Sequence, residues 1–190
     1  WCKASNKGHA NSMNKLAECY FEGSGVEEDK ALAVKWWIKG AENFDLESMH
    51  HLGECYYNGW GIEKDGSLAF SWLDKAVQQG HYEAKVDLGV CYYHGVGVDK
   101  DYDKAIELWQ ERRYHSMLVD FMLGQCYYYG YGKTINQEKG ISLIESAASE
   151  ELEMAVTFLA ENIATNPTIK PIDSSTKDSE IINTSTNLSK

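Results

Sequence analysis

Proline is almost absent from this sequence of 190 residues and occurs only as Pro167 and Pro171. Because proline is the strongest helix breaker, everything before Pro167 is free to form a mostly helical body. The sequence also lacks any run approaching the roughly 20 uncharged apolar residues of a membrane-spanning helix, and it lacks a charged-then-apolar signal segment. We therefore expect no membrane insertion.

Positive charge is scarce as well, with 18 lysines and arginines against 29 aspartates and glutamates. The resulting net charge of −11 repels phosphate backbones and anionic lipid surfaces, which argues against nucleic acid as a partner. A hydrophobic content of 43%, with 12% aromatic residues, is nevertheless enough to build a core. The chain is expected to fold.

The main feature present is a repeat of about 36 residues. Each copy contains a Leu-x-x-Cys-Tyr motif, then a Gly-x-Gly motif, then an Asp or Asn. The leucines are Leu16, Leu52, Leu88 and Leu123, the first glycines Gly23, Gly59, Gly95 and Gly130, and the acidic or amide residues Asp29, Asp65, Asp101 and Asn136. Such a coincidence of spacing indicates tandem structural units.

Each unit reads as two helices, here called helix A and helix B. Helix A carries the leucine motif and is expected to end at the first glycine, which enters the left-handed region cheaply. Helix B is expected to begin at the Asp or Asn, whose side-chain oxygen can cap free backbone N–H groups. Apolar residues then follow at spacings of three and four, as in the Ala-Leu-Ala-Val-Lys-Trp-Trp segment after Asp29.

The repeat predicts the organisation of the whole chain. A one-residue contraction between Glu111 and Met117 is expected to lie in a loop between units. The Ser-, Thr- and Asn-rich end is read as a flexible tail. The predicted segments are the end of a preceding helix B at 1–9, units at 10–45, 46–81, 82–116 and 117–152, a partial capping helix at 153–163, and the tail at 164–190.

The pattern Leu-Gly-x-x-Tyr-x-x-Gly-x-Gly-Val/Ile, then Asp, then Ala-x-x-Trp, resembles the Sel1-like repeat family, relatives of the tetratricopeptide repeats. The resemblance spans residues 1 to about 163 and implies an all-α fold, a right-handed α-solenoid of antiparallel helix pairs that acts as an adaptor. The fourth unit departs from the pattern at Lys133, Gly140, Leu143 and Ile144. Its helix pair is therefore expected to be the weakest.

The cysteines invite three interpretations, namely disulfides, metal ligands or core packing. Cys19 lies three residues after Leu16 and four before Gly23, so it shares the helix face of the repeat leucine. Core packing is favoured there, since free cysteine behaves as a small hydrophobe. Some secreted relatives bridge the two helices of each repeat, which needs a second cysteine in helix B, and none of these units has one. Reduced cysteines fit the cytoplasm.

No metal, cofactor or catalytic residue is predicted. His50 and His51 are adjacent and face different sides, and no histidine pairs with a Cys or His at a typical metal spacing. The Gly-x-Gly motifs lack the strand, third glycine or lysine of phosphate loops. No nucleophile motif is present, so we expect no enzymatic activity. The helix B tryptophans are read as core and inter-repeat packing rather than as a binding box.

Positions offset from the leucine stripe of helix A vary between units, which favours a recognition role. In tetratricopeptide repeats this side lines the concave groove, and the resemblance implies the same here. The predicted partner-binding residues are Asn14, Glu18, Phe21, Glu22, His50, Glu54, Tyr57, Asn58, Val86, Val90, Tyr93, His94, Phe121, Gln125, Tyr128 and Tyr129. The alternative is that the recurrent aromatic residues among them only pack against the next repeat.

These observations predict a non-catalytic scaffold that binds a protein or peptide with basic and apolar anchors. The alternative is a regulatory repeat segment of a larger enzyme, such as a kinase or ubiquitin-ligase subunit. A small-molecule hydrolase is disfavoured because no polar catalytic cluster can be assembled. Sequons at Asn183 and Asn187 leave the endoplasmic reticulum lumen as the alternative to the cytoplasm.

Overall fold

The computed structural model describes residues 10–110 and 116–165. These residues form α-helices joined by turns, and none of them lies in a strand. The helices are α2 (Ala10–Glu22), α3 (Lys30–Glu42), α4 (Leu46–Asn58), α5 (Gly66–Gln78), α6 (Glu83–His94), α7 (Tyr102–Gln110), α8 (Met117–Tyr129), α9 (Gln137–Ser149) and α10 (Glu153–Thr165). The predicted all-α fold is confirmed.

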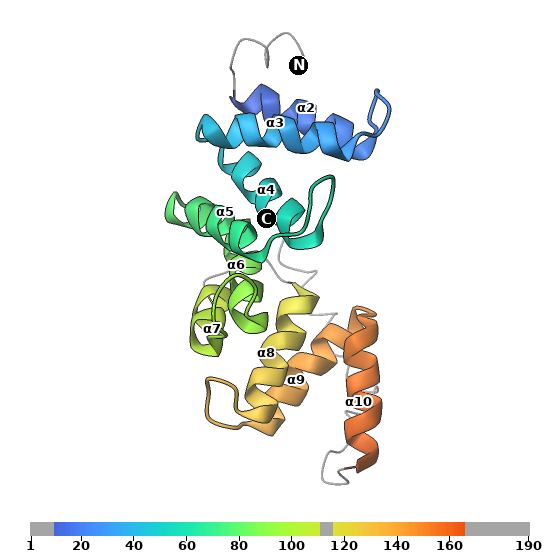
Figure 1. Ribbon diagram of the computed structural model, residues 1–190. Coiled ribbons are helices and arrows are strands. Elements are labelled where there is room, and N and C mark those ends of the chain that lie inside the picture. The colour runs from blue at the N-terminus through green and yellow to red at the C-terminus, as the bar shows by residue number, and fades with distance from the viewer. Residues whose placement is uncertain (1–9, 111–115, 166–190) are drawn as a thin grey trace, which may run out of the picture.

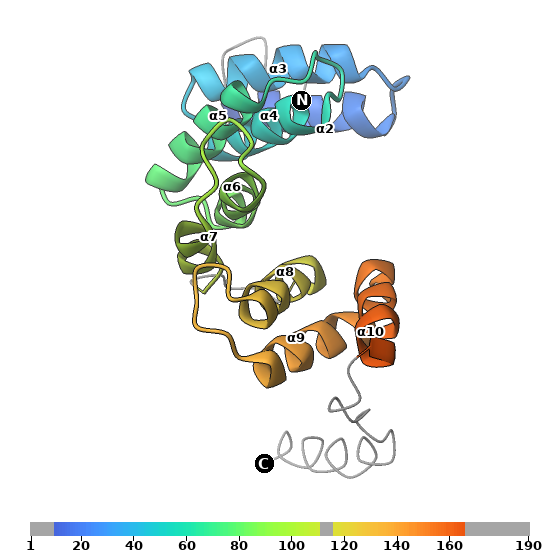
Figure 2. The ribbon, with the colours of Figure 1, turned by 60° about the horizontal axis from the view of Figure 1, so that its bottom comes forward.

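The helices stack as successive pairs. Helix A packs on helix B in the pairs α2–α3, α4–α5, α6–α7 and α8–α9, and α10 packs on α9 (Figure 1). Neighbouring pairs meet through α3 and α4, α5 and α6, and α7 and α8. Figure 2 shows the pairs following an open arc, with α3, α5, α7 and α9 outside and α2, α4, α6 and α8 toward the hollow side. The chain is an α-solenoid.

The helix ends follow the predicted capping chemistry. Side-chain oxygens of the capping residues accept backbone N–H groups three residues on, at 2.9–3.0 Å. These residues are Asp29, Asp65, Asp101 and Asn136. At the other end of each helix A, the first glycine has a left-handed φ of 71–81°, as at Gly59 and Gly95. Both predictions about where the helices begin and end are confirmed.

Helix A of the second, third and fourth units carries a glycine opposite a large buried side chain of helix B, and the first unit has Ala17 at that position. The large residues occupy equivalent positions and are all buried, namely Trp37, Leu73, Trp109 and Ile144. A Cβ added to Gly89 would overlap the indole ring of Trp109, and one on Gly124 would lie 2.5 Å from Cγ1 of Ile144. The Leu-Gly step of the motif therefore sets how closely the paired helices approach.

The second glycine of the Gly-x-Gly motif forms a contact between units. A Cβ on Gly97 would overlap the carbonyl oxygen of Gly66, at the start of helix B of the preceding unit. Gly61 meets the carbonyl of Lys30 in the same way, one unit earlier. The motif thus ends helix A and also docks each loop on the unit before it.

The fourth pair is packed more closely than its departures from the repeat pattern suggest. Gly140 lets α9 approach α8, since a Cβ there would lie 2.8 Å from the carbonyl oxygen of Gly124. The buried Ile144 fills the position of the tryptophans. The reduced stability expected of this unit stays a prediction, but loose packing is not its cause.

Some expectations lie outside the described residues. These are the preceding helix B at 1–9, the tail and sequons within 166–190, and most of the loop with the one-residue contraction, at 111–115. The helix expected at 153–163 corresponds to α10, which runs two residues further to Thr165. In the described part of the chain, no helix is both long and apolar enough to cross a bilayer.

Candidate functional site

A cavity of about 260 Å³ opens where α4, α6, α8 and α10 face one another. Its walls come mainly from helix A residues of the second, third and fourth units, which the stacking brings side by side. The lining residues are Glu54, Tyr57, Asn58, Leu73, Asp87, Val90, Tyr93, His94, Leu118, Phe121, Met122, Gln125 and Met154. Eight of the predicted partner-binding residues are thereby brought together in one hollow.

The cavity wall joins apolar surface to polar groups that are held in place. The phenol of Tyr93 donates a hydrogen bond of 2.9 Å to Oε1 of Gln125, which ties α6 to α8 across the hollow. The Tyr93 ring also contacts Trp109, with ring centroids 5.7 Å apart. Burial raises the pKa of Tyr93, so its hydroxyl stays protonated and remains a donor.

Two carboxylates, Glu54 and Asp87, line the cavity. Burial alone would raise the pKa of Glu54, but the hydrogen bond with His51 and the nearby charge of His50 outweigh it and lower that pKa. Burial and the charge of Lys100 lower the pKa of His94, which leaves it neutral. Among the residues lining the cavity, Glu54 and Asp87 are acidic and neither lysine nor arginine is present. A cationic group is favoured there.

The predicted residues of the first unit lie outside this cavity and have structural contacts. Asn14 is buried, and its Oδ1 accepts a 2.9 Å hydrogen bond from the Trp37 indole. Its amide donates to Glu18, which is also paired with Lys15. Phe21 packs on Trp37, while Glu22 is exposed. A role of Asn14 in binding would require the helix pair to open, so Asn14 belongs to the core.

The remaining predicted residues also have packing roles. His50 is buried and pairs with Asp87 at 2.6 Å. Val86 packs into the core of the third unit and its carbonyl accepts the indole N–H of Trp109. Tyr128 is buried against Phe158 of α10, and the exposed Tyr129 stacks on Tyr131. Among these, only Tyr128 belongs to the recurrent aromatic residues for which packing against the next repeat was the alternative, and its contact with α10 is of that kind.

Several cavity residues were missed by the repeat analysis. Asp87 occupies the position that His51 holds one unit earlier. Because the residue at this position changes between units, it could have been predicted as a binding residue by the same criterion as the others. Leu118 is the second residue of α8 and Met154 the second residue of α10, and both lie outside the helix A positions that the repeat register singled out. Leu73 belongs to helix B. Contacts between non-equivalent positions were not accessible from the repeat alone.

The described cysteines act as packing residues. Cys55, Cys91 and Cys126 are buried free thiols, and burial raises the pKa of each to about 12. They stay protonated at neutral pH and are poor nucleophiles and metal ligands. Cys19, expected to be buried like the others, is partly exposed.

Two groups of side chains have the types and spacing of metal ligands. Glu47, His50 and His81 form one group, and His50, His51 and Glu54 form the other. The sequence argument against a metal site considered only spacing along the chain. His81 lies 31 positions after His50, yet the fold brings their ring centroids to 4.8 Å.

Stacked helix pairs with a hollow inner face define a protein of the α-solenoid repeat class, and the comparisons specify the family. The model of the Sel1 repeat matches residues 10–43, 46–81, 83–111 and 120–151, so the chain belongs to the Sel1 repeat family. Sel1 repeat proteins generally mediate protein–protein interaction. The search of curated proteins found no match.

Solved structures show the same architecture. A protective antigen of uropathogenic Escherichia coli strains, with an SLR fold, is 26% identical with a TM-score of 0.70 over 83% of this chain and 34% of that chain. A Sel1 repeat protein from Oxalobacter formigenes is 26% identical with a TM-score of 0.66 over 82% and 64% of the two chains. This chain therefore spans about a third of the first relative and less than two thirds of the second.

Proposed function

We propose that this chain is a non-catalytic scaffold whose inner helix A surface binds a segment of a partner protein. The observation that carries the proposal is the cavity shared by α4, α6, α8 and α10. Its volume of about 260 Å³ lies below the roughly 300–1,000 Å³ of sites that enclose a whole small molecule. One or two anchoring side chains of a peptide are a better fit.

The chemistry of the wall indicates which anchors would fit. Apolar surface from Val90, Leu118 and Met154 suits an aliphatic or aromatic side chain. Glu54 and Asp87 supply negative charge that suits a lysine or arginine at the rim. A partner segment with one apolar and one basic anchor would use both parts of the surface.

Two further observations support the proposal. The buried thiols are protonated at neutral pH, which supports a scaffold over thiol-based catalysis. The described cysteines are all free, which supports work in a reducing compartment such as the cytoplasm.

The proposal predicts that peptides selected against this chain will depend on the cavity. Linear peptides would be selected from a randomised display library and their affinities measured by fluorescence anisotropy. We expect the double variant Leu118→Glu, Met154→Glu to weaken binding at least about tenfold, because it places charge where an apolar anchor would sit. The two side chains are 37% and 50% exposed, so the fold should tolerate the change.

The matched control is Leu68→Glu on α5, where the leucine is 40% exposed and lies away from the cavity. Its affinity should equal that of the wild type. Equal affinities for all three proteins, or a loss confined to the Leu68 variant, would contradict the assignment of the binding surface.

A further inference from the structure

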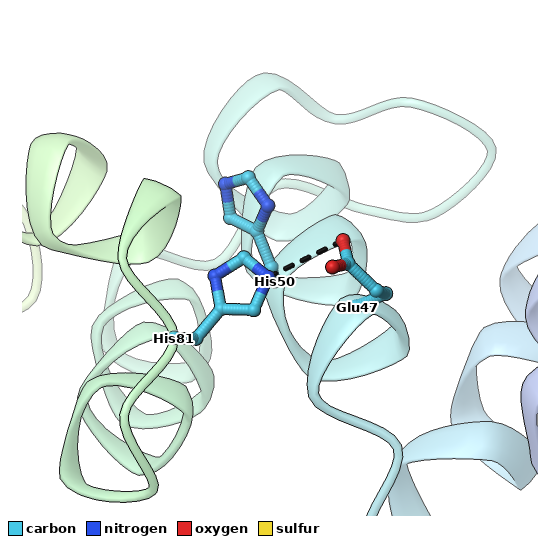
Figure 3. Close-up of side chains that lie close together, drawn as sticks. All are labelled: Glu47, His50 and His81. Carbon is cyan, nitrogen blue, oxygen red and sulfur yellow. Dashed lines mark ion pairs between the residues drawn. The ribbon is translucent and has the colours of Figure 1, made fainter. Parts of the chain in front are cut away.

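The joint between the second and third units holds three side chains that converge on one point. Glu47 and His50 are three residues apart on α4, so they share one face of that helix. His81 precedes α6 and comes from the turn between units. One donor atom of each residue lies within 4.8 Å of the others. Figure 3 shows the His81 ring and the Glu47 carboxylate facing each other beside the His50 ring.

His81 is buried with an unused nitrogen. Its side chain is only 4% exposed, and its Nε2 has no hydrogen-bond partner among the residues that the structure describes. The carboxylate of Glu47 lies 3.2 Å from that nitrogen, as an ion pair without hydrogen-bond geometry. A buried polar atom normally has a partner, because leaving it without one is costly. The nitrogen points into the group, where a ligand would supply that partner.

We propose that Glu47, His50 and His81 bind a divalent transition-metal ion, with Zn²⁺ as the natural occupant. Two imidazoles and one carboxylate are a ligand set that zinc uses, leaving a fourth position open. The Glu-x-x-His spacing on one helix is also used by metal sites in helical bundles. The site bridges α4 and the start of α6, so a bound ion would fasten two units together.

The residues around the histidines complete the arrangement. Nε2 of His50 lies 2.6 Å from Oδ2 of Asp87, so Nδ1 is the ring nitrogen left to bind a metal, which would displace any proton on it. Nδ1 of His81 accepts the backbone N–H of Ala84 at 3.1 Å, and a carboxylate oxygen of Glu83 lies 3.8 Å away. A histidine that binds a metal usually donates its other N–H to such a carboxylate.

Metal binding requires the ring proton of His81 to move from Nε2 to Nδ1. In the metal-free form Nδ1 accepts the Ala84 N–H, so the ring proton lies on Nε2. With the ion on Nε2, the proton resides on Nδ1 and is donated to Glu83 in place of the Ala84 contact. The competing Ala84 contact keeps the site weaker than one built without it.

The geometry needs only side-chain movement. Ligand atoms around a tetrahedral zinc ion are about 3.4 Å apart, so donor atoms that now lie within 4.8 Å must approach one another by up to about 1.4 Å. The Glu47 side chain is 58% exposed and can move without disturbing the core. The second group, with His51 and Glu54, is less available because Nδ1 of His51 is already bonded to Glu54 at 3.0 Å.

Isothermal titration of the untagged 190-residue chain with Zn²⁺ tests the proposal. We expect one ion per chain, affinity at least about tenfold weaker for Glu47→Gln, and no site in His81→Gln. His51→Gln is the matched control and should bind like the wild type. Because His81 is buried, circular dichroism must show that its variant is folded, while the exposed Glu47 variant does not depend on that check.

Cobalt(II) provides the second measurement. The wild type should give the visible absorption of a four-coordinate ion with nitrogen and oxygen ligands, and Glu47→Gln should lose it. Absence of stoichiometric Zn²⁺ binding, equal affinity of the wild type and Glu47→Gln, loss in His51→Gln, or thiolate absorption with cobalt would each overturn the assignment.

Discussion

Replacing Trp109 with alanine is expected to lower the free energy of unfolding by about 3–5 kcal/mol, the range for deleting a large aromatic side chain from a core. The indole is 1% exposed, packs in the core shared by α7 and α8, and donates a 3.0 Å hydrogen bond to the carbonyl of Val86. The variant leaves a cavity against Gly89 and removes that bond. Urea unfolding followed by circular dichroism measures the change.

Trp72→Ala is the control for this experiment. Trp72 is partly buried, and its ring lies 4.2 Å from Nζ of Lys75 at the edge of the core. Less apolar surface returns to water, so the loss should be less than half that of Trp109→Ala. If the two variants lost equal stability, the inward position of Trp109 would not be the main contributor to the stability of its unit.

The second large effect is expected at Gly97, where alanine should cost at least about 2 kcal/mol more than alanine at Gly25. Both glycines have left-handed backbones, with φ of 72° and 75°, so the conformational penalty of about 1–2 kcal/mol is shared. Of the two, only Gly97 has its added Cβ overlapping a neighbouring unit, at Gly66, whereas none of the described residues lies within 4 Å of a Cβ at Gly25. Overpacking supplies the difference.

The comparison isolates the contact between units, because the local conformation is the same at both sites. Chemical unfolding of the two variants under identical conditions gives the difference directly. Equal losses would show that the loops do not dock on the preceding helix B as described.

Local structure could be predicted from the sequence because each signal depends on a few neighbouring residues. Asp29 and Asp65 cap helices through bonds that span three residues, and Gly59 ends a helix by its own conformational freedom. These effects do not depend on the rest of the fold. The repeat then placed the copies of the motif in equivalent environments, apart from Cys19 and Gly25 in the first unit.

The interior glycines show what the sequence did not reveal. Gly89 lies in the middle of α6, where glycine has an unfavourable helix propensity. A glycine is needed there because the Trp109 ring of the partner helix leaves no room for a Cβ. Likewise, Gly140 was expected to weaken the fourth unit, but it permits close packing on Gly124. Both depend on distances between helices, which the repeat pattern does not specify.

The candidate surface could be predicted only in part, because the helical offset of a residue is visible in the repeat but its contacts with other helices are not. Residues at the right helical offset in the second to fourth units, such as Tyr57, Val90 and Gln125, meet in the cavity. The offset could not distinguish Asn14, whose side chain turns inward to Trp37. It also could not show that His81 reaches His50 across the joint between units.

Hydrogen–deuterium exchange of the chain, with and without a peptide selected for tight binding, tests the central claim most directly. If the inner helix A surface is the recognition surface, the peptide should slow exchange in α4, α6 and α8 and leave α3 and α5 unchanged. Slowing concentrated in the outer helices α3, α5 and α7, with none in α4, α6 or α8, would contradict the account.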